Sequence, residues 1–176
     1  IITLSRGGYI KRVLPSSFKS QHRGGKGLIG AEVAEEDFLD FFISANTHDN
    51  MLFFTDRGRV FQTKSYEIPA AVRTAKGKSI NNFLEISMAE KISAIINYGK
   101  DAKGYLVMVT KNGLIKKTAL DDFSNVRRTG IIALSLKKDD QLKWVKLSSG
   151  SDEIILTTAQ GQAIRFKESQ LRPMGR

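Results

Sequence analysis

Two stretches of the chain, residues 51–62 (MLFFTDRGRVFQ) and residues 106–117 (LVMVTKNGLIKK), follow one plan. In each, a short apolar run leads to a Thr, then to a tight turn, and then to a second extended run that ends in a polar or basic residue. The turns contain Gly58 and Gly113, because glycine tolerates the positive φ that a hairpin turn needs. The flanking runs are rich in Val, Ile, Phe and Thr, which favour a pleated strand. Each stretch therefore predicts a β-hairpin.

The same plan occurs four times, so this is a repeat protein. The other two copies lie at residues 2–12 and 154–165, and the spacings between successive turn glycines are 50, 55 and 48 residues. The four turn glycines are Gly8, Gly58, Gly113 and Gly161.

A second pattern, called the marker here, travels with the hairpins: basic residues and a glycine precede another apolar run. The marker glycine follows the turn glycine by 19, 19 and 17 residues, in residues 23–27, 73–77 and 127–130. A further strand is expected after each marker, most clearly at residues 131–136, and a last one at residues such as 91–97 or 143–147. About four strands in ~50 residues is the size of a propeller blade. The sequence thus predicts one all-β, propeller-like domain over residues 1–176, with repeats near 1–50, 51–104, 105–153 and a truncated 154–176.

Helices should be few and short. The only plausible helical windows lie near residues 31–40 and 86–91. Because the chain begins at Ile1 and its fourth repeat stops before a marker, we expect an excised piece of a longer protein, in which further blades close the array.

The charge balance points to a polyanionic partner. With 28 Lys and Arg against 18 Asp and Glu, the net charge is +10, and residues 1–31 contain six basic residues and no acid. The chain has 41% apolar residues, which excludes a wholly disordered protein, and no apolar run of the ~20 residues that a membrane helix needs. It has no Cys, which excludes disulfides and thiolate chemistry, and only two His, which excludes a His cluster for a metal.

No constellation of catalytic residues is visible. Residues 77–79 (GKS) match the end of a P-loop, but Val72 stands where the loop needs its first glycine. The carboxylate pairs at residues 121–122 and 139–140 are sequence neighbours, whose side chains point apart in a strand. We therefore expect no catalytic residue and no cofactor in this chain.

Residues 21–27 (QHRGGKG) are the most informative short motif. Three glycines let the backbone approach a bulky partner closely and expose its N–H groups. Arg23 and Lys26 add charge-assisted contacts to phosphate oxygens. The motif predicts a clamp on a phosphate backbone, with no means of reading bases.

This motif closely resembles the seven-residue box, consensus QRRGGKG, of the DNA gyrase A C-terminal domain family, with His22 where an Arg is usual. The repeats resemble the blades of that family throughout, and residues 172–176 look like its inter-blade segment. The resemblance implies a β-pinwheel, a propeller-like disc of usually six four-stranded blades, of which about three and a half would be present. It also implies non-sequence-specific DNA binding and chiral wrapping around a basic rim, which enables negative supercoiling by an ATP-hydrolysing type II topoisomerase.

The family further implies double-stranded DNA, the N-terminal domain of gyrase A and the gyrase B protein as partners in an A2B2 enzyme. It implies a bacterial, cytoplasmic and nucleoid-associated location, with no membrane partner. The family's cleavage Tyr lies in a separate domain, directly after an Arg. Because none of the four Tyr here follows an Arg, the cleavage site is expected elsewhere, as are the sites for ATP and Mg²⁺.

The expected DNA contacts fall into two sets. One set follows the turn glycines: Lys11, Arg12, Arg59, Lys116, Lys117 and Arg165. The other accompanies the markers, and we expect it to form the DNA track along one edge: Lys19, Gln21, His22, Arg23, Gly24, Gly25, Lys26, Gly27, Arg73, Lys76, Lys78, Arg127 and Arg128.

Two alternatives stay open. The related C-terminal domain of topoisomerase IV, a decatenating enzyme, generally has a degraded or missing box. A propeller that serves as a protein-interaction module would explain the repeats but not the charge.

Overall fold

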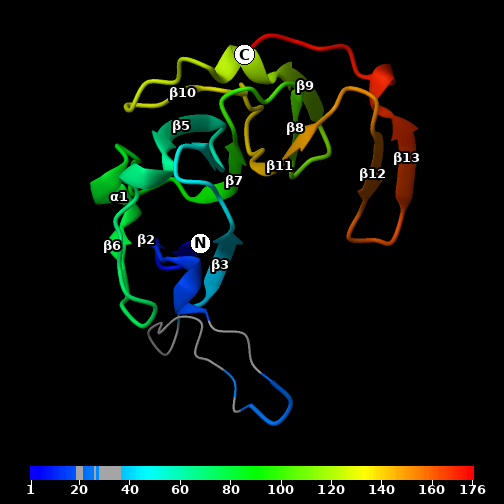
Figure 1. Cartoon of the computed structure of the whole chain (residues 1–176). Coiled ribbons are helices and arrows are strands. Elements are labelled where there is room, and N and C mark those ends of the chain that lie inside the picture. Colours follow the sequence, from blue (N-terminus) through cyan, green and yellow to red (C-terminus); the bar gives the residue numbers. More distant parts are fainter. Residues whose placement is uncertain (19–21, 26, 28–36) are drawn as a thin grey trace.

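The computed structural model of the chain describes residues 1–18, 22–25, 27 and 37–176. These residues form four small sheets that follow one another in sequence order around an arc (Figure 1). The prediction of an all-β fold is confirmed, and each predicted hairpin supplies two neighbouring strands of one sheet.

The strands have the following bounds. The first sheet contains β1 (Ile2–Ser5), β2 (Tyr9–Arg12), β3 (Leu39–Ile43) and β6 (Lys78–Ser79). The second contains β4 (Asn50–Thr55), β5 (Arg59–Lys64), β7 (Ile92–Tyr98) and β10 (Ile131–Ile132). The third contains β8 (Tyr105–Thr110), β9 (Ile115–Ala119) and β11 (Leu142–Ser148), and the fourth contains β12 (Glu153–Thr157) and β13 (Ala163–Lys167).

The hairpin turns share one hydrogen-bond pattern, which explains the Ser or Thr before each turn. The N–H of Gly58 donates to the carbonyl of Thr55 at 3.0 Å, and Thr55 Oγ1 accepts from the N–H of Arg59 at 3.2 Å. Gly58 has φ +77°, and a Cβ there would lie 2.3 Å from the carbonyl oxygen of Leu134. The equivalents of Thr55 in the other hairpins are Ser5, Thr110 and Thr158.

In each of the first two sheets, one edge strand, called the outermost strand here, comes from the repeat that follows in the sequence. The strand orders are β3-β1-β2-β6 and β10-β5-β4-β7. β6 follows the marker of the second repeat, yet it pairs with β2, where Ile10 lies opposite Lys78. β10 follows the marker of the third repeat and pairs with β5, where Val60 lies opposite Ile131. Each of these sheets is therefore built from two repeats and not from one.

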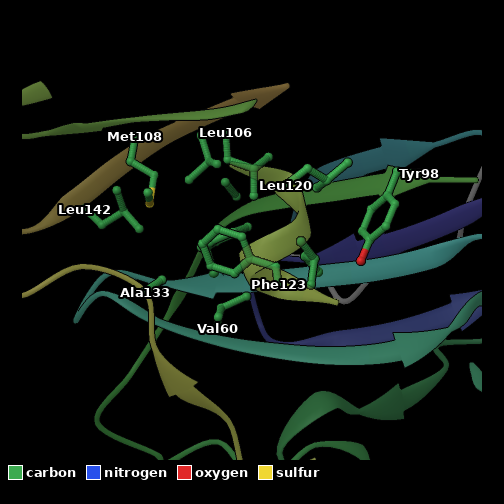
Figure 2. Packing of buried hydrophobic residues seen from close by; sticks show 12 residues of the cluster. Val60, Tyr98, Leu106, Met108, Leu120, Phe123, Ala133 and Leu142 are labelled. Atoms are coloured by element: carbon green, nitrogen blue, oxygen red, sulfur yellow. The ribbon is translucent and has the colours of Figure 1, made fainter. Parts of the chain in front are cut away.

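Two apolar clusters fill the spaces between the first three sheets. On β4, Phe53 belongs to the cluster shared with the first sheet and Phe54 to the cluster shared with the third, because neighbouring strand residues point to opposite faces. Both side chains are fully buried, which explains why β4 is a continuous apolar run. In the second cluster, Figure 2 shows Phe123 in the midst of side chains from both sheets, and its ring meets that of Phe54 edge-on at 6.0 Å.

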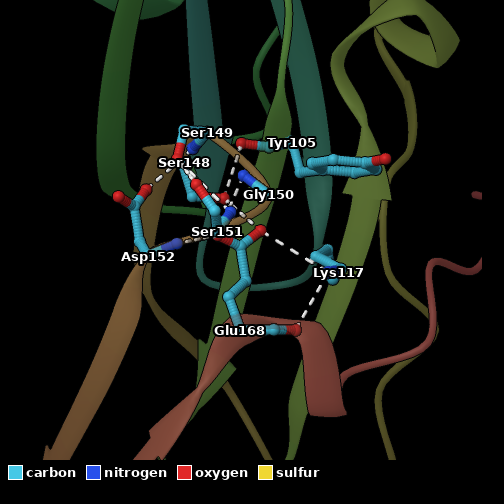
Figure 3. A network of polar contacts seen from close by, with 8 residues as sticks. All are labelled: Tyr105, Lys117, Ser148, Ser149, Gly150, Ser151, Asp152 and Glu168. Carbon is cyan, nitrogen blue, oxygen red and sulfur yellow. Dashed lines mark hydrogen bonds and ion pairs between the residues drawn. The ribbon is translucent and has the colours of Figure 1, made fainter.

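The third sheet and the fourth repeat are joined by a polar network. Glu168 is completely buried, and its carboxylate oxygens accept from Ser148 Oγ at 2.8 Å and from the N–H of Gly150 at 3.0 Å (Figure 3). Lys117 Nζ lies 3.6 Å from Glu168 Oε1 and donates to the Glu168 carbonyl at 3.0 Å. The joint between the third sheet and the fourth repeat therefore contains a buried ion pair, whereas the first three sheets are packed together through apolar clusters.

The helical expectations were wrong in detail. The α-helix found among the described residues is a single turn, α1 (Ile80–Phe83), while residues 86–91 form a turn and coil. Residues 31–36 lie outside the described part, and β3 begins at Leu39. The strand predicted at residues 131–136 is shorter, ending at Ile132. In the described ranges, no helix has the length and apolar composition that crossing a bilayer requires.

Short 3₁₀ turns follow the second strand of every hairpin. They begin seven residues after each turn glycine, which places them at the same position in all four repeats: η1 (Pro15–Ser17), η2 (Ser65–Glu67), η3 (Leu120–Phe123) and η4 (Glu168–Gln170).

Candidate nucleic-acid interface

The marker loops of the second and third repeats lie on the outer edge of the arc, since each leads into the outermost strand of a sheet. Lys76 precedes β6 and Lys78 lies in it, and both side chains are exposed. Arg127 and Arg128 precede β10 and are also exposed. Four of the predicted cations thus stand on the same edge of two successive sheets.

These two groups of cations adjoin. Arg128 Nη2 donates to the carbonyl of Phe83 at 3.4 Å, and Phe83 is the last residue of α1, which directly follows β6. Lys76 Nζ lies 3.9 Å from the centroid of the Tyr9 ring, which holds this side chain against the first sheet. Lys76, Lys78, Arg127 and Arg128 are called the outer strip below.

The marker of the first repeat is only partly described. His22, Arg23, Gly24, Gly25 and Gly27 are exposed. Gly24 and Gly27 have φ +88° and +82°, and a Cβ on either would meet no atom within 4 Å. Gly24 and Gly27 therefore have the left-handed backbone conformation that favours glycine. The remaining predicted contacts of this segment, Lys19, Gln21 and Lys26, lie outside the described residues.

Lys11 and Lys117, predicted as DNA contacts, need correction because their side chains are only 2% and 4% exposed. Lys11 Nζ donates to the carbonyls of Arg73 and Ala75 at 2.5 and 2.6 Å. Lys117 Nζ lies in the network around Glu168. Both lysines follow the turn glycine on strands whose faces are covered by neighbouring structure, so their ammonium groups are used inside the protein.

Two arginines of the same set are half-buried and bonded. Arg12 Nε and Nη2 donate to the carbonyls of Ile68 and Tyr66 at 3.3 and 3.4 Å. Arg59 Nη1 forms an ion pair with Glu90 at 2.9 Å, in which Glu90 is 6% exposed. These guanidinium groups brace loops between sheets, and little of either is left for an external ligand.

The other predicted cations divide between the interior and the surface. Lys116 Nζ donates to the carbonyl of Ala133 at 3.2 Å, and partial burial lowers the pKa of Lys116. Arg73 is half-buried, and its Nη1 atom has no hydrogen-bond partner among the described residues. Arg165 is exposed and lies 3.7 Å from Glu153.

A carboxylate that was not predicted from the sequence links the hairpin turn to an edge strand of its sheet, β3 in the first sheet and β11 in the third. Asp140 Oδ1 accepts from the N–H groups of Asn112 at 3.0 Å and Gln141 at 2.8 Å. Asp37 Oδ1 does the same for Gly7 at 2.8 Å in the first repeat. The sequence signal was an acid at a similar distance after each turn glycine: Asp37 lies 29 residues after Gly8, and Asp140 lies 27 residues after Gly113.

These contacts stabilise the ionised carboxylates. Burial raises the pKa of Asp140, but hydrogen bonds from the Thr110 side chain and from two backbone N–H groups outweigh it, so the pKa lies below its usual value. The pKa of Asp37 is lowered mainly by the hydrogen bond from the Ser5 side chain. Both acids therefore work as turn braces and are not poised for proton transfer.

Comparison with known families gives a consistent result. The sequence profile described as "DNA gyrase C-terminal domain, beta-propeller" matches residues 1–46, 49–85, 104–149 and 152–176, one stretch for each repeat. The whole chain is 44% identical to part of the DNA gyrase A protein of Clostridium acetobutylicum, 47% to that of Streptococcus pyogenes serotype M1, and 45% to that of Haloquadratum walsbyi. The chain spans about a fifth of these relatives, 21%, 22% and 21% of their lengths.

Solved structures agree on the fold. A structure of the C-terminal domain of DNA topoisomerase IV superposes on 99% of the chain with a TM-score of 0.81 at 30% identity, and the match covers 53% of that structure. A structure of a DNA gyrase A C-terminal domain superposes on 99% of the chain with a TM-score of 0.76 at 24% identity, and the match covers 56% of that structure. These likenesses agree with the arc of strand-exchanging sheets described above.

Proposed function

The chain belongs to the DNA gyrase C-terminal domain family, and on that premise we propose that it binds double-stranded DNA without sequence preference and wraps it along the outer strip. The observation that carries the proposal is the adjoining of Lys76 and Lys78 with Arg127 and Arg128 on one curved edge. Cations in such a row contact phosphates and leave the base edges unread.

The curvature of the edge explains why a row of cations is needed. DNA has a persistence length of about 150 bp, so bending it around a small protein costs several kcal/mol. A row of phosphate contacts offsets this cost only if successive contacts follow one path. The cations of the outer strip lie along such a path, from β6 past α1 to the loop before β10. The first-repeat box, with the exposed Arg23 and left-handed glycines, would extend the path by a further phosphate clamp.

For the whole protein, we propose the role of gyrase A, in an A2B2 enzyme with gyrase B. Wrapping with a fixed hand would present a chosen DNA crossing to the strand-passage gate and so permit negative supercoiling. DNA cleavage, ATP hydrolysis and Mg²⁺ binding would belong to other domains, and the enzyme would act in the bacterial cytoplasm beside the nucleoid.

Topoisomerase IV is the second candidate, because the structure of its C-terminal domain superposes well at 30% identity. The curated gyrase relatives are more similar, at 44–47%, and residues 21–27 keep six of the seven consensus positions of the gyrase box. A supercoiling enzyme is therefore favoured over one that only relaxes and decatenates.

Binding of the 176-residue chain to a random-sequence duplex, measured by fluorescence anisotropy at several salt concentrations, tests the DNA contact. Log K should fall linearly with log salt, with a slope of about −0.9 for each phosphate neutralised. Replacing Arg127 and Arg128 by Ala should make the slope less negative by about 1.8. Replacing Lys100 and Lys103, two exposed lysines of the β7–β8 loop, removes the same charge and should change it much less. An affinity that hardly depends on salt contradicts the proposal.

The box is tested in the complete enzyme. If residues 21–27 are replaced by alanines, supercoiling should disappear, while relaxation and decatenation of the same plasmid survive, since they need no chiral wrap. Supercoiling at the wild-type rate would make the box a structural loop only. Loss of both activities, checked by the melting temperature of the isolated domain, would indicate misfolding.

A further inference from the structure

The loop that contains Lys76, residues 69–78 and called the arch here, is hydrogen-bonded to β2 at both ends. At its first end, the N–H of Arg12 donates to the carbonyl of Pro69 at 2.9 Å, and the N–H of Ala71 donates to the carbonyl of Arg12 at 3.0 Å. At its second end, Lys78 of β6 pairs with Ile10 of β2. Lys11 lies on β2 between these two attachment points, so its side chain starts beneath the middle of the arch.

Lys11 fixes the peptide groups of the arch. Its Nζ atom donates to the carbonyl oxygens of Arg73 and Ala75 at 2.5 and 2.6 Å, and the residue is 2% exposed. A buried ammonium is costly unless such partners surround it, and charge-assisted bonds of this length are among the strongest in proteins. The two carbonyls must therefore point inward, toward β2.

Inward carbonyls turn the other side of the same peptide groups outward. The chain has no cis peptide bond among its described residues, and in a trans peptide the N–H points opposite to the C=O. The N–H groups of Thr74 and Lys76 share peptide groups with the Arg73 and Ala75 carbonyls, so they point away from Lys11. Neither donates a hydrogen bond within the described residues, and both residues are exposed.

We propose that the N–H groups of Thr74 and Lys76 bind one phosphodiester oxygen of the wrapped DNA, and that Lys11 is the positioning residue that aims them. Outward backbone N–H groups close in sequence form a known kind of anion site, and the ammonium groups of Lys76 and Lys78 add attraction. The site rests on the proposed DNA binding and adds to it a contact made by the backbone and controlled by a buried charge.

The next marker loop provides an internal comparison. At the position of Lys11, the third residue after the turn glycine, the second repeat has Phe61, whose ring would lie 2.6 Å from a Cβ on Gly130. There the N–H of Gly130 donates to the carbonyl of Arg127 at 2.9 Å and is used within the loop. Here Arg59 Nη2 donates to the carbonyl of Thr129 at 2.7 Å, but the N–H that shares this peptide group is that of Gly130. The loop therefore offers cations but not the same outward amide pair.

The test follows the backbone amides of the ¹⁵N-labelled 176-residue chain by NMR during titration with a short random-sequence duplex. The amide protons of Thr74 and Lys76 should move strongly downfield, as expected for hydrogen bonds to phosphate oxygen. If the duplex moves the amides of residues 127–129 but not those of Thr74 and Lys76, the inference fails while DNA binding stands. If no amide moves, DNA binding itself fails. A response to inorganic phosphate with none to the duplex also overturns the assignment.

Lys11→Met tests the positioning role, because it keeps the length and the burial and removes the ammonium. Affinity for the duplex should fall roughly ten- to a hundredfold, the size of one lost charge-assisted hydrogen bond. The downfield shifts at Thr74 and Lys76 should vanish, while those near Arg127 persist. Lys100→Met is the matched control for the loss of one charge and should keep all the shifts. Full shifts at Thr74 and Lys76 in a folded Lys11→Met chain refute the role, and the wild-type titration decides about the site if that variant does not fold.

Discussion

Glu168 should be the most sensitive residue at the joint between the third sheet and the fourth repeat. Its side chain has no exposed surface, and it accepts from Ser148 Oγ and from the N–H of Gly150 while facing the 4%-exposed ammonium of Lys117. Glu168→Ala removes these acceptors together and leaves two partly buried donors, as well as the buried Lys117 charge, with fewer partners.

The magnitude follows from burial. Breaking a buried ion pair by removal of one partner costs about 3–5 kcal/mol, because the remaining charge stays in a poorly solvated site. The matched control is Glu153→Ala in the same repeat. Glu153 also forms an ion pair, with Arg165 at 3.7 Å, but the two side chains are 50% and 67% exposed. An exposed pair contributes about 0–1 kcal/mol, so the two variants should differ by roughly 2–5 kcal/mol.

Urea unfolding followed by the fluorescence of Trp144 measures this difference. Trp144 is the only Trp of the chain and lies on β11, the strand that also contains Ser148. The free energies of unfolding are compared at equal slope against urea, since a changed slope would mean that the fourth repeat unfolds separately. If Glu168→Ala and Glu153→Ala lie within about 1 kcal/mol of each other, the assigned role of the buried pair is refuted.

Three further predictions concern the packing and the turns. Gly77→Ala should destabilise the chain by roughly 1–3 kcal/mol more than Gly161→Ala, and equal losses in urea unfolding would contradict this. Both glycines have positive φ, but a Cβ at Gly77 would lie 2.6 Å from the Ile10 carbonyl oxygen, whereas a Cβ at Gly161 would meet nothing within 4 Å. Phe123→Ala should cost about 3–5 kcal/mol by the same measurement, because the fully buried ring fills the cluster between the second and third sheets, and a loss below about 1 kcal/mol would show that the cluster collapses around the gap. The lowered pKa of Asp140 contributes stability that is present above its unfolded value of 3.8 and is lost as the pH falls through the lower folded value. Melting temperatures recorded from about pH 6 to about pH 2.5 should therefore fall less steeply for Asp140→Asn than for the parent chain, and parallel curves would show that the brace does not depend on charge.

The hairpins could be predicted from sequence because their determinants are local. Gly58 and Gly113 adopt the positive φ expected of them, and the Thr before each turn makes the bonds that recur in every repeat. The exchange of outer strands could not be predicted in this way. β6 and β10 have two residues each, too few for a periodic signal, and their partners are set by contacts with β2 and β5 that are distant in the chain.

The positions of the predicted cations could be predicted only in part, for a similar reason. Alignment of the repeats placed Lys76 and Arg127 at equivalent positions, and the structure puts both on the outer edge. The same alignment grouped Lys11 with Arg59 as DNA contacts, although Lys11 is buried and Arg59 is half-buried and paired with Glu90. Lysine is almost always exposed in proteins, and sequence alone gives no sign that two carbonyls of the next repeat accept hydrogen bonds from this one.

Because β8 and β9 separate β7 from β10 along the chain, the second sheet is not a contiguous segment and cannot be excised or duplicated by itself. A whole repeat like the second can be, since the second repeat gives β6 to the sheet before it and receives β10 from the repeat after it. Insertion of a copy at the repeat boundary leaves every sheet complete, and the arc grows by one step. Evolution can therefore change the copy number of this module without redesigning any sheet, and under the proposed function each added copy lengthens the DNA path by one blade.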